Sequence, residues 1–188
     1  MNRKHIAWGL RIIGVVALAV SLGALAQSPS PVHLSGLIND YTLEHDPNTG
    51  NVVGPWEIRG EWSMTMQGAS GTANFSAYVT MEHSDYWTEN FGNLDSSSSR
   101  NPHTHHITMV GGVVAPITNG FSVTGPISVT GNGNAAFPGS TLEVDITGGD
   151  TVAQSNIVLK FMGGAAGHFG SQPVHGVVAF NGTPAGTQ

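Results

Sequence analysis

The chain has 188 residues, a formal net charge of −6 at pH 7 and no cysteine, which excludes disulfides, thiolate metal ligands and a cysteine nucleophile. Beyond residue 26 its fixed cations are Arg59, Arg100 and Lys160, which face all twelve Asp and Glu residues. This shortage of cations argues against nucleic acid and against an anionic membrane surface as partners, because both are bound through clustered Lys and Arg.

The first 26 residues have the features of an export signal. Basic residues at positions 3, 4 and 11 come before an uncharged run, 12–26, which ends in Ala24-Leu25-Ala26. That order of charge, apolar core and small-residue cut site is typical of a signal peptide, and the apolar run is shorter than the roughly 20 residues of a spanning helix. We therefore expect cleavage after Ala26, a secreted or periplasmic location, and no membrane contact after cleavage.

The rest of the chain is predicted to form one domain. Residues 27–54 are polar and predict an irregular lead-in with a turn at 46–50, residues 55–182 predict an antiparallel β domain, and 183–188 a flexible tail. The clearest strand is Trp56 to Gln67, where apolar and polar residues alternate. A Gly-rich loop and a second alternating segment that begins near Phe75 complete a hairpin.

Weaker alternation continues to the C-terminal end in six segments, separated by Gly, Asn and Pro turns: His105 to Val110, Phe121 to Thr124, Ile127 to Thr130, Leu142 to Thr147, Ile157 to Phe161 and Val174 to Phe180. A long loop is predicted from Trp87 to Pro102. This pattern predicts an all-β fold, a single antiparallel domain of about eight strands, and a small barrel is slightly favoured over a sandwich because the first hairpin is long.

Histidines provide the functional signal. His103-x-His105 places two imidazoles on one face of a strand, with the same parity as the apolar residues that follow, and His83 continues the inward parity of the second hairpin strand. We predict that His83, His103 and His105 form a site at one end of the core, completed by His168 or His175 from the Gly-rich C-terminal segment. Three nitrogens with an open position suit a divalent transition metal: zinc, copper or iron.

Other interpretations remain open. The histidines could form a structural or ligand-contacting polar cluster, or share no site. If inward aromatic and methionine side chains lined a pocket, the protein would be a non-catalytic barrel that binds a small molecule; a third class is an extracellular or envelope interaction protein. The sequence implies no organic cofactor and leaves the oligomeric state and enzymatic activity open. It lacks a Gly-x-Ser-x-Gly elbow, a phosphate-binding loop and a His-Glu-x-x-His helix.

Overall fold

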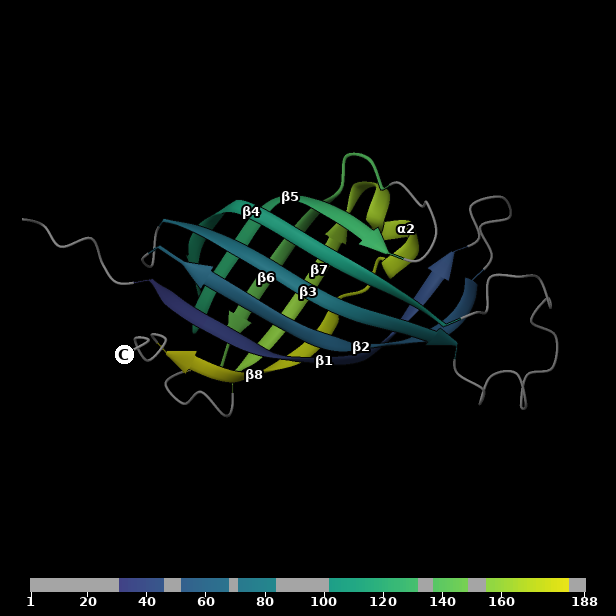
Figure 1. Cartoon of the computed structure of the whole chain (residues 1–188), viewed down its shortest axis with the longest axis horizontal. Helices are drawn as coiled ribbons and strands as arrows, with labels where there is room; N and C mark the ends of the chain where they lie inside the picture. Colours follow the sequence, from purple (N-terminus) through teal and green to yellow (C-terminus); the bar gives the residue numbers. More distant parts are fainter. Residues whose placement is uncertain are drawn as a thin grey trace, which may run out of the picture.

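The computed structural model describes residues 31–45, 52–67, 71–83, 102–131, 137–148 and 155–182. Within them, eight antiparallel strands close into one barrel, and each strand pairs with the next along the chain until β8 pairs with β1 (Figure 1). The prediction of a single all-β domain is confirmed, and the closed barrel is the form it takes. The strands are β1 (Val32–His45), β2 (Val52–Met66), β3 (Thr72–His83), β4 (His103–Ile117), β5 (Gly120–Gly131), β6 (Thr141–Thr147), β7 (Asn156–Met162) and β8 (Val174–Gly182).

A short helical cap lies between β7 and β8. It consists of the 3-10 turn η3 (Gly163–Ala165) and the single-turn helix α2 (Ala166–Phe169). The helix α2, labelled in Figure 1, contacts β1 and β7. No helix in the described part of the chain is long and apolar enough to cross a membrane. The predicted signal, the C-terminal tail, the turn at 46–50 and the long loop as far as residue 101 lie outside the described residues.

Alternation of side chains builds the wall of the barrel. Along β6 and β7 every second residue is buried and its neighbours are partly or fully exposed, as expected when one face of a sheet meets the core. The inward side chains form one continuous apolar core, and each fully buried large side chain contributes about 1.5–3 kcal/mol. The aromatic and methionine residues predicted to face inward are all buried in this core: Trp56, Trp62, Met64, Met66, Phe75 and Met81.

Two elements differ from the sequence prediction. Half of the predicted irregular lead-in is a strand, β1, which pairs with β2 along its length and with β8. The two short segments predicted on either side of Gly125-Pro126 form one strand, β5, which pairs with β6 through both residues. In each case cross-strand pairing outweighs the local signals of Gly, Pro and polar residues.

The barrel closes at a glycine. A Cβ atom on Gly36 of β1 would lie 1.8 Å from the carbonyl oxygen of Val177 on β8, so only a residue without a side chain allows the two backbones to approach this closely. The indole Nε1 of Trp62 donates a hydrogen bond of 3.2 Å to the same carbonyl from inside the barrel. The register between β1 and β8 shifts at this point.

Candidate metal centre

Two histidines of the site come from alternate positions on β4. His103 and His105 precede Ile107 and Met109, both of which are buried in the core. Because side chains two residues apart on a strand share a face, the two imidazoles are neighbours, with ring centroids 4.9 Å apart. His105 is 4% exposed and His103 is half-buried.

The third histidine, His168, is supplied by the cap. Phe169, the next residue, is fully buried and stacks on Phe161 of β7 with ring centroids 4.3 Å apart. The hydroxyl of Thr42 on β1 donates a hydrogen bond to the carbonyl oxygen of Phe169. The cap begins at Gly163, whose φ of 68° is in the left-handed region that favours glycine. These contacts fix the cap against the barrel and direct His168 toward β4.

The three imidazoles converge through their Nε2 atoms. His168 Nε2 lies 2.8 Å from His105 Nε2 and 3.2 Å from His103 Nε2, and all three ligand atoms fall within 4.8 Å of one another. An imidazole nitrogen carries either one hydrogen or one in-plane lone pair, so His168 Nε2 cannot form a good hydrogen bond to both partners at once. For comparison, two nitrogens that bind one tetrahedral zinc at 2.0–2.1 Å are separated by about 3.3 Å.

Burial keeps His105 neutral. Its pKa is lowered from 6.5 to about 4, first because burial disfavours the charged ring and then because His168 and His103 would repel it, although the backbone of Thr130 acts in the opposite direction. A neutral imidazole has the lone pair that a metal needs. The Nδ1 of His105 is buried without a hydrogen bond of standard geometry among the described residues. The ring is therefore oriented less firmly than in most histidine ligands, in which the second nitrogen is hydrogen-bonded.

Aromatic rings surround the cluster. Trp56 contacts His103 edge-on with ring centroids 5.3 Å apart. Phe137 lies 5.2 Å from the ring of His168 and 6.0 Å from that of His105, and Phe169 also contacts both. Within the described residues, the group that could hold a metal contains three histidines and no carboxylate. The surroundings are therefore largely apolar, which strengthens any charge interaction inside them.

The structure divides the predicted site residues. It brings together His103, His105 and His168. The backbone of His83 pairs with Trp56 at the end of β3, and the side chain of His83 lies outside what the structure describes. His175 is elsewhere: it is exposed on β8, where its Nδ1 lies 2.7 Å from Asp40 Oδ2 and its backbone N–H donates to the same oxygen at 2.8 Å.

The aromatic surroundings and the Asp40–His175 pair were not predicted. Phe169 follows His168 directly, so a buried anchor beside a candidate ligand was a signal available in the sequence. Phe137 and Asp40 come from distant segments and carry no such signal, because only the folded barrel brings them near these histidines.

Comparisons with known proteins found no matching family, no matching curated protein and no matching solved structure. Fold and site alone therefore define the protein's class. It is a closed eight-stranded antiparallel β-barrel with a three-histidine cluster that could bind a metal.

Proposed function

We propose that the protein binds one divalent transition metal through His103, His105 and His168. The observation that carries this proposal is the gathering of three imidazoles whose ligand atoms lie within 4.8 Å of one another, around a His168 Nε2 that cannot form a good hydrogen bond to both neighbours at once. Zinc, copper and iron all accept imidazole ligands.

The ligand set favours a reactive ion over a structural one. Structural zinc sites are closed by four protein ligands, whereas catalytic sites have three and keep a position open for water or substrate. Among the residues that the structure describes, the ligands are three imidazoles and no carboxylate, so the charge of the ion would be uncompensated in apolar surroundings, which favours an anion at the open position. We therefore propose that a metal-held water acts on a small substrate with a carbonyl or acidic group.

An all-nitrogen ligand set also suits the proposed exported location. Outside the cytoplasm thiolate ligands are exposed to oxidation, and this chain offers none. Imidazole does not undergo thiol oxidation, so the site would remain intact in an oxidising compartment.

The test is metal content and affinity. Protein purified without a histidine tag is analysed for metals, stripped with EDTA and titrated with Zn²⁺, Cu²⁺ and Co²⁺. We expect one equivalent to bind, and the Co²⁺ complex to show the intense visible absorption of a tetrahedral site. His105→Ala should reduce affinity at least 100-fold.

A neighbouring histidine provides the matched control. His106 is the next residue on β4 and bonds outside the core to Ser76, so His106→Ala should bind metal like the original protein. Circular dichroism of both variants establishes that the barrel is intact. Equal loss of binding in the two variants, or a stripped protein that takes up none of the three ions, would refute the metal site.

A further inference from the structure

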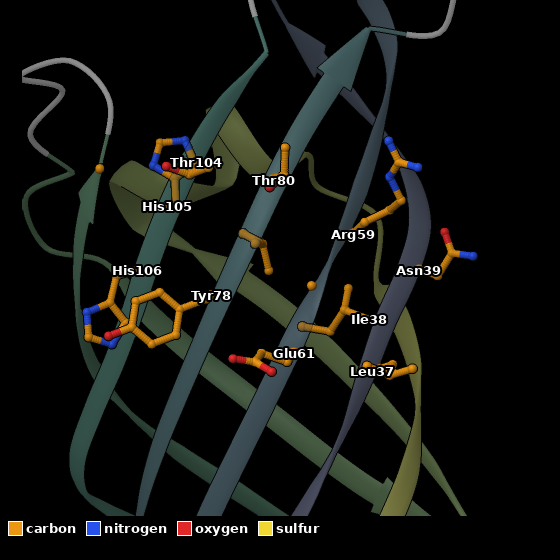
Figure 2. Close-up of a pocket in the computed structure, with 13 residues that line it drawn as sticks. Leu37, Ile38, Asn39, Arg59, Glu61, Tyr78, Thr80, Thr104, His105 and His106 are labelled. Carbon is orange, nitrogen blue, oxygen red and sulfur yellow. The ribbon is translucent and has the colours of Figure 1, made fainter.

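A second site lies on the outside of the barrel. A groove of about 740 Å³ runs across β1 to β4 and reaches Gly131 at the end of β5. Figure 2 labels Leu37, Glu61 and Tyr78 on the outer face of these strands, whereas Ile38 and His105, also labelled there, are buried. The register of the sheet places Leu37, Glu61 and Tyr78 side by side across β1, β2 and β3, so these three side chains form the centre of the groove.

Tyr78 forms a rigid aromatic wall. Its ring is stacked on His106 of β4, with centroids 4.0 Å apart and planes within 4°. His106 is itself held by a contact of 3.0 Å between its Nε2 and the hydroxyl of Ser76. Because one face of the tyrosine ring is covered from the β4 side, the other face is directed toward β2. The ring is 57% exposed, and Leu37 on the opposite side is equally exposed.

Glu61 supplies an unbalanced negative charge between these two walls. Figure 2 shows its side chain between Tyr78 and Leu37, and among the described residues it forms no ion pair. Arg59 is the cation that also borders the groove. Its charge is shared by two carboxylates, Glu82 at 2.5 Å and Glu57 at 3.5 Å, so it leaves Glu61 uncompensated.

We propose that this groove binds an organic cation, an alkylammonium group with an apolar substituent. The cation would lie against Glu61 and the free face of Tyr78, because an aromatic face attracts a positive charge through its quadrupole. The apolar part would contact Leu37. A simple inorganic cation has no apolar part to contact Leu37, and an anion is disfavoured by Glu61 and by the net charge of −6.

Choline and benzyltrimethylammonium are suitable probes, and the uncharged isostere of choline, in which carbon replaces the quaternary nitrogen, is the ligand control. Binding is followed by NMR titration of the metal-free protein through the amide signals of Leu37, Glu61 and Tyr78. We expect saturable shifts for both cations and at least tenfold weaker binding of the isostere. Glu61→Gln and Tyr78→Leu should each weaken cation binding about five- to tenfold.

Glu143→Gln is the matched control, since it removes one carboxylate from the distant strand β6 and leaves Lys160 paired with Asp145. It should bind the probes with unchanged affinity. Unsaturated shifts up to 50 mM probe, equal binding of cation and isostere, or a Glu61→Gln variant that binds like the original protein would overturn the proposal. His105 of the histidine site also lines the groove; because the titration uses metal-free protein, its outcome does not depend on whether the histidines bind an ion.

Discussion

Two adjacent histidines on β4 show how strand alternation assigns chemistry to a residue. His105 is buried beside two other imidazoles, whereas His106 is on the outer face, stacked on Tyr78. They are identical side chains one position apart, yet only the inner one lies where a metal could be shared. A shift of one residue in register would exchange their environments.

The environment of His105 predicts how metal-free protein responds to acid. In the unfolded chain the imidazole of His105 takes up a proton near pH 6.5. In the folded barrel its pKa is lowered to about 4, so it stays neutral until the pH falls to that value. Between these values the unfolded state binds more protons than the folded state. The contribution of His105 to the free energy of unfolding is therefore fully present above pH 6.5 and is lost as the pH falls. The loss attributable to His105 is on the order of 3 kcal/mol by pH 4.

Urea unfolding of EDTA-treated protein at several pH values from 4 to 7.5 measures this dependence. His105→Leu removes the titrating group and retains an apolar side chain, so its stability should change less with pH than that of the original protein. Parallel pH profiles for the two proteins would contradict the assignment.

At the scale of elements, the cap between β7 and β8 is the part that completes the site. Its seven residues bring His168 to two histidines that precede it by more than 60 positions. The cap is held to the barrel by the buried Phe169 and by the hydrogen bond from Thr42. A metal shared with β4 would fasten it at a third point.

Thr42→Val tests whether the cap positions His168. The substitution keeps the shape of the side chain and removes the hydroxyl, leaving the carbonyl of Phe169 without this donor. We expect a loss of about 1–2 kcal/mol in stability and metal affinity reduced about three- to tenfold, because ordering the cap then costs part of the binding free energy. Isothermal titration with Zn²⁺ measures the affinity.

Thr108→Val, on a half-buried outward position of β4, is the control and should leave zinc affinity unchanged. If Thr42→Val binds zinc as tightly as the original protein, the hydrogen bond has no part in placing His168.

The sequence predicts the strands with clear alternation and misses the one without it. In β1 the inward positions include Gly36 and Thr42, and the outward positions include Leu37 and Tyr41, so the two faces differ little in polarity. Gly125-Pro126 has the composition of a turn, but both residues still pair with β6, and the residues on either side of them pair with β4. Local composition cannot report such long-range pairing.

The histidine site was predictable only in part, because strand alternation is a local signal and the position of the cap is not. Spacing on one strand identifies His103 and His105, since alternate residues always share a face. Selecting His168 over His175 requires the geometry of the cap, which depends on contacts of Phe169 and Thr42 made only in the folded barrel. Both candidates are in Gly-rich sequence, which does not distinguish them.

For the whole molecule, closure of the barrel is the main structural constraint. A closed sheet has no free edge, and here the last strand must meet the first along β1 and β8. At this seam Gly36 leaves no room for a Cβ atom beside the carbonyl oxygen of Val177. Closure also brings Thr42 of β1 to the cap that precedes β8, so the seam supports the histidine site as well as the core.

Gly36→Ala should open this seam. The added methyl group would lie 1.8 Å from the carbonyl oxygen of Val177, and backbone atoms cannot move aside without breaking ladder hydrogen bonds, so we expect a loss of at least about 3 kcal/mol in stability. Hydrogen exchange should increase most along β1 and β8. Gly167→Ala is the control, because a Cβ there would meet nothing within 4 Å and alanine favours the helical cap. The thermal midpoint of Gly167→Ala should equal or exceed that of the original protein. If Gly36→Ala instead leaves the thermal midpoint and the hydrogen exchange unchanged, the barrel does not depend on close approach of β1 and β8 at this seam.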